Sequence, residues 1–274
     1  MIHQGWRQVL DLLFPRACSL CGRLVVDERS PTLCFHCEQD FPKIEFGCFK
    51  CGAPVRNHSS SNLEGGESRG TKRAKQGCSF CRSQGWSFGR VFAHSVYSSS
   101  AAKASRLMKE PSHESFTRNI GSMLANWLLA REDFSPVQYD CIVPIPQHWM
   151  RRITHRYNHA AVLAEWLSRG LEIPYSESYL IRSRWTSKQG LKTISERREN
   201  LKNAFQVKST KSLRYQSILI VDDVMTSGAT LQDASRVLRA GGARHVDAVV
   251  FARGVNANRP IASQAVSFGR TTQV

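Results

Sequence analysis

Eight cysteines near the start of this 274-residue chain have the spacing of metal ligands. They form four Cys-x-x-Cys pairs within the first 81 residues. Two cysteines separated by two residues present both sulfurs to one tetrahedral ion, and two such pairs complete a closed shell of four thiolates. Because the N-terminus lacks the pattern of a secretory signal, we favour thiolate metal sites over a disulfide framework. The sequence therefore predicts two structural Zn²⁺ ions, held by Cys18, Cys21, Cys34, Cys37, Cys48, Cys51, Cys78 and Cys81.

The spacing leaves open which cysteine pairs share an ion. Sequential pairing is the simplest arrangement, and an interleaved pairing is also consistent with the spacing. Gly22 and Gly52 each follow the second cysteine of a pair, where a knuckle turn often needs the positive φ that glycine adopts readily. The ninth cysteine, Cys141, lies in the apolar segment CIVPIP and is expected in the core.

A second stretch whose residues could take part in binding or catalysis is ILIVDDVMTSGATL, residues 218–231. Four aliphatic residues run into Asp222 and Asp223, and a glycine among hydroxylated residues follows. In parallel α/β sheets ligands bind at the carboxyl ends of strands, and the amides at the start of the next helix bind phosphate. Carboxylates beside a phosphate would repel the ligand unless they contact sugar hydroxyls or a hydrated Mg²⁺. The stretch therefore predicts a ligand that has a 5′-phosphate and a diol.

This stretch resembles the phosphoribosyl pyrophosphate (PRPP) motif of type I phosphoribosyltransferases. The resemblance implies that Asp222 and Asp223 are catalytic and hold the ribose hydroxyls, with Mg²⁺ accompanying PRPP. It also implies a 5′-phosphate site made of Thr226, Ser227, Gly228, Ala229 and Thr230. The reaction would be a displacement at the anomeric carbon with pyrophosphate leaving, promoted by positioning and by neutralisation of the leaving group.

The wider chain is similar to the ComF/GntX family, in which cysteine knuckles precede a phosphoribosyltransferase-like domain. Two further segments carry this resemblance: VPIPQHWMRRITHRYNHAAVLA at 143–164 and SKQGLKTISERRENLKNAFQV at 187–207. Lys109 is matched with a lysine that the family carries after the first helix of this domain. The resemblance implies substrate contacts from Arg151, Arg152, Arg156, Gln189 and Arg197.

One departure from the family pattern concerns the basic loop. Where the family typically has Arg-Gly-Phe-Asn-Gln, this chain has His155-Arg156-Tyr157-Asn158-His159, so that an arginine replaces the glycine. Either the register of the loop is shifted or its conformation no longer needs a glycine. The nucleobase or other acceptor of a transfer reaction has no recognisable signature in the sequence.

The charge of the chain favours a polyanionic partner. Lysine and arginine number 38 against 22 acidic residues, a formal net charge of +16. Between Arg182 and Arg214, five arginines and five lysines accompany two glutamates. This segment is interpreted as a lid over PRPP, as a track for a nucleic-acid backbone, or as a solvated charged helix.

The resemblance leads to two candidate functions. The first is a ComF-type protein with a PRPP or ribose-5-phosphate pocket that takes part in DNA uptake and natural transformation. Its candidate partners are single-stranded DNA and competence proteins such as a helicase or a recombination factor. The second is an active phosphoribosyltransferase in nucleotide or related metabolism. A cytoplasmic protein with no membrane span is expected, because the apolar runs are short.

The elements that must position these residues alternate between strands and helices. Alternation of this kind predicts an α/β fold, a type I phosphoribosyltransferase-like parallel sheet with helices on both faces. Expected strands are 91–98, 140–146, 178–183, 204–207, 217–223 and 245–253, and expected helices are 1–15, 115–130, 158–169, 195–203 and 231–241. The expected domains are 1–89, an N-terminal helix and double zinc-knuckle module with a mobile loop at 57–77, then 90–254, with 255–274 a disordered tail.

Overall fold

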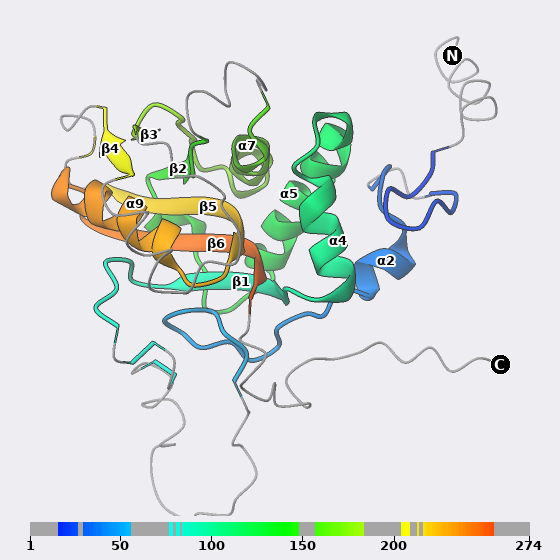
Figure 1. Ribbon diagram of the computed structural model, residues 1–274, viewed down its shortest axis with the longest axis horizontal. Helices are drawn as coiled ribbons and strands as arrows, with labels where there is room; N and C mark the ends of the chain where they lie inside the picture. The colour runs from blue at the N-terminus through cyan, green and yellow to red at the C-terminus, as the bar shows by residue number, and fades with distance from the viewer. Residues whose placement is uncertain are drawn as a thin grey trace, which may run out of the picture.

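The central element of the fold is a parallel β-sheet, seen in a computed structural model (Figure 1). The structure describes residues 16–26, 30–55, 77–78, 81–82, 84–147, 157–183, 204–208, 213 and 216–254. Within these residues four strands pair in the order β1-β6-β5-β2, all parallel. The strands are β1 (Val91–Val96), β2 (Cys141–Pro144), β5 (Ser217–Met225) and β6 (His245–Arg253). The predicted α/β fold class is confirmed.

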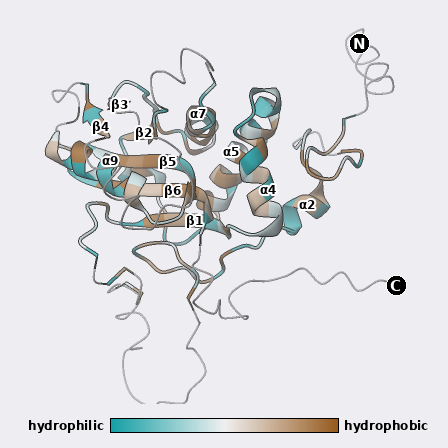
Figure 2. Cartoon of the chain, in the orientation of Figure 1, coloured by the Kyte–Doolittle hydropathy of each residue, from teal (hydrophilic) through white to brown (hydrophobic). Residues whose placement is uncertain are grey.

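Side chains along β5 point alternately to the two faces of the sheet, and helices cover both faces. Leu219 and Val221 join the core formed with α4 (Ser99–Leu107), α5 (Glu114–Leu129) and α7 (His159–Leu171). Ile218 and Ile220 point to the other core, which includes the buried side of α9 (Ala229–Ala240). A strand that is buried on both faces needs a continuous apolar run, which is why ILIV is uninterrupted. In Figure 2 β5 is largely hydrophobic, whereas hydrophobic and hydrophilic residues alternate along α9.

The cysteine-rich region is packed into both cores. Cys18 and Cys34 lie in the same hydrophobic cluster as the buried residues of α4 and α5. Cys48, Cys51 and Cys81 lie in the opposite cluster, with Val91 and Ala93 of β1. Isolated bridges between Ala17 and Leu24 and between Gly47 and Pro54 close the two knuckles, and a bridge from Lys43 to Ser95 joins this region to β1. The two cysteine groups therefore pack against opposite faces of the sheet.

Two predicted strands do not join the central sheet. β3 (Leu180–Arg182) and β4 (Phe205–Val207) pair with each other in an antiparallel sheet of their own. Strands of three residues carry too little pattern to specify a partner. Asp233 of α9 fixes the start of β4, because its carboxylate accepts the backbone N–H groups of Ala204 and Phe205 at 3.0 and 3.3 Å.

The remaining sequence predictions concern the helices, the 57–77 loop and the C-terminal tail. The short helix α2 (Phe35–Gln39) and α4 are present without having been predicted. The buried side of α4 consists of Ala101, Ala104 and Ser105, so α4 lacks the large apolar residues at helical spacing from which α5 and α7 were predicted. The helices expected at 1–15 and 195–203, nearly all of the 57–77 loop and the 255–274 tail lie outside the described residues. No helix in the described part of the chain is long and apolar enough to cross a membrane.

Candidate ribose-phosphate site

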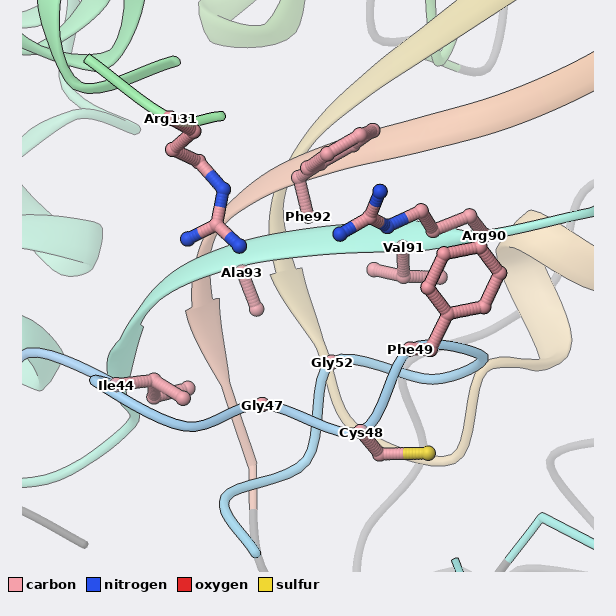
Figure 3. A pocket seen from close by; sticks show the side chains of 10 residues that line it. All are labelled: Ile44, Gly47, Cys48, Phe49, Gly52, Arg90, Val91, Phe92, Ala93 and Arg131. Atoms are coloured by element: carbon pink, nitrogen blue, oxygen red, sulfur yellow. The ribbon is translucent and has the colours of Figure 1, made fainter. Parts of the chain in front are cut away.

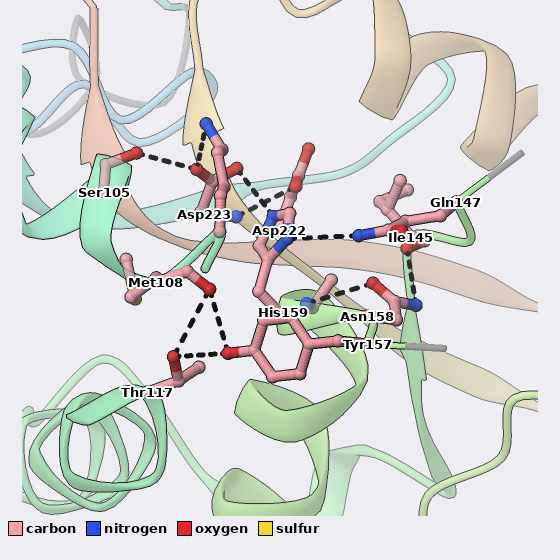
Figure 4. Close-up of polar contacts among 12 residues, drawn as sticks. Ser105, Met108, Thr117, Ile145, Gln147, Tyr157, Asn158, His159, Asp222 and Asp223 are labelled. Atoms are coloured by element: carbon pink, nitrogen blue, oxygen red, sulfur yellow. Dashed lines mark hydrogen bonds and ion pairs between the residues drawn. The ribbon is translucent and has the colours of Figure 1, made fainter. Parts of the chain in front are cut away.

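The two acidic residues of the motif lie near the carboxyl end of β5 (Figure 4). The strand continues through them to Met225, two residues beyond the predicted end. Asp223 is 5% exposed, whereas Asp222 is only partly buried. The adjacent carboxylates therefore have different environments, which the sequence pattern did not distinguish.

Asp223 is held by groups from three segments. Ser105 Oγ of α4 donates to Asp223 Oδ2 at 2.7 Å, and Lys109 Nζ pairs with the same oxygen at 2.7 Å. His159 Nε2, at the start of α7, lies 3.4 Å from Asp223 Oδ1. Burial by itself raises the pKa of Asp223, but the hydrogen bond and charge of His159 and the Lys109 ammonium outweigh it and hold that pKa well below its usual range. Asp223 is thus an ionised carboxylate anchored to two helices.

Asp222 has the opposite electrostatic environment. Its Oδ1 accepts the backbone N–H of Asp223 at 2.9 Å. Burial and the neighbouring Asp223 charge raise the pKa of Asp222 well above its usual range. A partly exposed carboxyl with a raised pKa can accept or donate a hydrogen bond to a sugar hydroxyl, so Asp222 is the better placed of the two acids to contact a ligand.

The segment that departs from the family pattern positions His159. Tyr157 OH donates to the carbonyl of Met108 at 2.9 Å and lies 2.7 Å from Thr117 Oγ1. Asn158 caps α7 by accepting the backbone N–H of Ala160 at 3.2 Å. These contacts hold the start of α7 against α5, through Thr117, and against the end of α4, through Met108, next to Lys109. The sequence reasoning missed Ser105 and His159 as partners of the acids, and it named Lys109 only through resemblance.

The predicted phosphate segment forms the turn between β5 and α9. We call residues 226–230 the phosphate turn. Gly228 caps α9 with φ +79°, and a Cβ there would lie 2.6 Å from Met225 Cε and 3.0 Å from Trp86. Only glycine therefore fits this position without strain. Ser227 is buried and accepts the Ala229 N–H at 3.4 Å, whereas Thr226 is exposed and Thr230 is partly exposed. The turn brings the start of a twelve-residue helix to the edge of the sheet that carries Asp222.

The remaining predicted substrate contacts are not placed beside this site. Arg151, Arg152, Arg156, Gln189 and Arg197 all lie outside the described residues. Their assignment remains a prediction from the family pattern. Within the described chain, the cationic group beside the acids is Lys109, together with the ring of His159.

The eight predicted cysteine ligands form two groups of four. The sequential pairing holds: Cys18, Cys21, Cys34 and Cys37 form the first cluster, and Cys48, Cys51, Cys78 and Cys81 form the second cluster. In the second cluster, sulfurs lie 3.6 Å apart for Cys48 and Cys81, and 3.8 Å apart for Cys78 and Cys81. A tetrahedron with Zn–S bonds of 2.3 Å has an edge of about 3.8 Å, so the donor set fits zinc.

Both knuckle glycines have the predicted conformation, with φ +74° at Gly22 and +66° at Gly52. The ninth cysteine, Cys141, is buried in the core with 4% of its surface exposed, as predicted. The closed thiolate shells leave no position for a reacting water, which makes the clusters structural.

A pocket separate from the acids lies between the second cluster and β1 (Figure 3). The guanidinium of Arg90 sits 4.3 Å from the centre of the Phe49 ring and 4.2 Å from that of Phe92. Arg131 and Arg90 both pair with Asp133. The guanidinium of Arg90 lies over two aromatic rings and its charge is paired with Asp133. Arg90 therefore holds the knuckle that carries Phe49 against β1.

Comparison with known families separates the chain into two parts. Residues 158–268 match the phosphoribosyl transferase domain, and residues 9–82 match the double zinc ribbon domain. The first match includes the phosphate turn and the second includes all eight cysteine ligands.

Curated relatives match different lengths of the chain. Competence protein F of Haemophilus influenzae is 36% identical over 115 residues, which are 42% of this chain and 50% of that protein. DNA utilization protein YhgH of Escherichia coli K12 is 35% identical over 108 residues, 39% of this chain and 46% of that protein. YhgH of Salmonella typhi is 28% identical over 225 residues, 79% of this chain and 94% of that protein.

The stronger matches thus span about half the length of the relatives concerned. The weaker match to the Salmonella typhi protein extends over nearly all of it. The double zinc ribbon match at one end, the phosphoribosyl transferase match at the other and the names of these relatives support the resemblance of the chain to the ComF family.

Proposed function

We propose that the chain binds a ribose 5-phosphate moiety, such as that of PRPP, at the carboxyl end of β5, as part of a protein that serves DNA uptake and natural transformation. The observation that carries the binding proposal is the junction of Asp222 with the phosphate turn at one edge of the sheet. The role in DNA uptake is supported by the names of the relatives, Competence protein F and DNA utilization protein YhgH.

Each part of the site has a role in this proposal. The amides and hydroxyls of Thr226–Thr230 bind the 5′-phosphate at the positive end of α9. Asp222 contacts the ribose hydroxyls, and Asp223, held by Lys109 and His159, keeps the strand end in place. The carboxylate oxygens would hold a hydrated Mg²⁺, which would supply positive charge for a pyrophosphate together with Arg151, Arg152 and Arg156.

Calorimetric titration of PRPP with Mg²⁺ tests the phosphate turn. Gly228→Ala strains the positive φ and meets Met225, and Thr230→Val removes a donor while keeping the side-chain shape. Each should weaken binding about tenfold or more, as expected for the loss of contacts to a charged ligand. Gly85→Ala is the matched control, because a Cβ there meets nothing within 4 Å. Equal affinities for all four proteins, or none for the parent, would refute the proposal.

Turnover is the second candidate function. The observation that favours it is the arrangement of the acids, because Lys109 and His159 contact Asp223 directly beside the partly exposed Asp222, which places carboxyl, imidazole and ammonium groups in one site. Release of pyrophosphate from PRPP in the presence of a panel of nucleobases and amines would establish transfer. Tight PRPP binding without pyrophosphate release from any mixture would leave a binding role alone.

We further propose that the protein binds single-stranded DNA through its basic surface. The net charge of +16 and the basic segment 182–214 support this, together with the names of the relatives. The affinity should fall with salt on a log–log plot, with a slope of about −0.7 for each phosphate neutralised. Replacing Lys188, Lys192, Arg197 and Arg198 by glutamine should flatten the slope in an anisotropy assay. Absence of binding at low salt would remove DNA as a partner.

A further inference from the structure

Arg253 connects the second cluster to the phosphate turn. It is the last residue of β6 and is only 2% exposed. Its Nε donates to the carbonyl of Cys51 at 3.0 Å. Its Nη1 donates to the carbonyls of Met225 and Thr226 at 2.9 and 2.5 Å. One planar guanidinium thus joins the backbone of a cysteine ligand to the backbone where the phosphate turn begins.

A second set of contacts runs from the segment after Cys81 to α9. Gln232 Oε1 accepts the backbone N–H of Ser87 at 2.7 Å, and Gln232 Nε2 donates to the carbonyl of Gly85 at 3.3 Å. Trp86, between these residues, lies so close to Gly228 that a Cβ there would be 3.0 Å from its ring. The second cluster is therefore linked to the phosphate turn through Arg253 and to α9 through the segment that follows Cys81.

The second knuckle also packs closely against β1 at Gly52. A Cβ at Gly52 would lie 2.8 Å from the Cβ of Ala93 and 3.1 Å from the carbonyl of Val91. Gly52, the neighbour of Cys51, therefore packs directly against β1 with no room for a side chain between them. Zn²⁺, when bound, supplies the tetrahedral closure that fixes the carbonyl of Cys51 relative to the other three ligands.

We infer that Arg253 is a positioning residue through which zinc binding at the second cluster orders the phosphate turn. The first cluster is the internal comparison, because its cysteines pack in the opposite core with α4 and α5. Loss of zinc from the second cluster should therefore loosen residues 226–230, and loss from the first should not. The consequence for ligand affinity rests on the proposed function, whereas the consequence for the turn does not.

Hydrogen exchange followed by mass spectrometry tests the coupling without a ligand. The reporter is a peptide spanning residues 224–232, which includes the Gln232 N–H that donates to Gly228 O at 2.8 Å. In zinc-loaded Arg253→Met this peptide should exchange about tenfold faster than in the parent, which corresponds to about 1.4 kcal/mol of local stability. Arg253→Lys should be intermediate, because it keeps the charge but lacks the planar fork.

Cysteine variants supply the matched pair. Cys78→Ser in the second cluster should speed exchange of the same peptide, and Cys37→Ser in the first cluster should leave it at the parent rate. Zinc content is measured on each sample, and Arg253→Met should retain the zinc content of the parent. If Arg253→Met fails to fold, Arg253→Lys and the cysteine pair decide the question. Unchanged exchange in Arg253→Lys and in Cys78→Ser would overturn the inference.

Titration of the same proteins with ribose 5-phosphate separates this inference from the proposed function. The expected result is about tenfold weaker binding by Arg253→Met than by the parent. If the parent shows no binding while exchange responds as described, the coupling stands and the proposed ligand is wrong. If all proteins bind equally and exchange is unchanged, the proposed ligand stands and the coupling is wrong.

Discussion

At the scale of single residues, Asp222 and Asp223 have different environments and therefore different expected roles. Asp223 is buried and makes contacts with Ser105, Lys109 and His159, whereas Asp222 is partly exposed beside the phosphate turn. A pair of identical residues in sequence therefore becomes one structural anion and one candidate ligand contact. The division follows from strand alternation, which sends neighbouring side chains to opposite faces.

The stability of asparagine variants tests this division. Asp223→Asn leaves Lys109 without its carboxylate partner and should cost about 1–3 kcal/mol, toward the low end because Lys109 is partly exposed. Asp222→Asn removes like-charge repulsion and should be neutral or stabilising. Urea unfolding of both variants and of the surface control Glu132→Gln gives the comparison. A larger loss for Asp222→Asn than for Asp223→Asn would reverse the assignment.

The pH dependence of these variants has opposite signs. The pKa of Asp223 is depressed on folding, so its stabilising contribution is present at neutral pH and is lost as the pH falls below about 4. The pKa of Asp222 is raised, so its ionisation opposes folding as the pH rises above the usual carboxyl range. Asp222→Asn should therefore gain stability relative to the parent as the pH rises above the usual carboxyl range. A difference in stability between the two proteins that stays constant as the pH rises from about 4 to neutral would contradict the raised pKa.

At the scale of elements, long apolar patterns were sufficient to predict the sheet and its main helices. β5, β6, α5 and α7 lie within a few residues of their expected ranges. α4 was missed because it buries alanine and serine, and the antiparallel pairing of β3 and β4 was missed because short strands do not encode a partner. The same limit applies to the candidate site. Ser105 lies on the helix that went unpredicted, and the approach of His159 to Asp223 depends on where α7 packs.

The packing of α5 against α7 sets that position and can be tested at Gly121. A Cβ at Gly121 would lie 2.7 Å from the Cβ of Trp166 and 3.3 Å from the carbonyl of Leu163. Gly121→Ala gains helix propensity of up to about 1 kcal/mol, but overpacking against the backbone costs about 1–3 kcal/mol. The variant should therefore be destabilised in urea, unlike Gly85→Ala, which meets open space. A stabilised Gly121→Ala protein would show that the helices can separate without cost.

At the scale of the whole molecule, the two cysteine clusters join both cores of the sheet to the N-terminal region. The first cluster packs with α4 and α5, and the second packs with β1 and the α9 side of the sheet. Metal analysis should find about two zinc ions per chain, and Cys37→Ser and Cys78→Ser should each lose about one. A chelator should lower the melting temperature of the parent, because both cores lose a closing contact. Full stability after complete metal removal would mean that the clusters do not support the fold.

The central claim is that a ribose 5-phosphate group is bound where Asp222 meets the phosphate turn, and a crystal structure of the protein soaked with PRPP and Mg²⁺ tests it most directly. The predicted result is density for the 5′-phosphate on the backbone of Thr226–Thr230 and for the ribose hydroxyls beside Asp222. Density for the ligand elsewhere, for example in the pocket between Phe49 and Arg131, with the phosphate turn empty, would contradict the account.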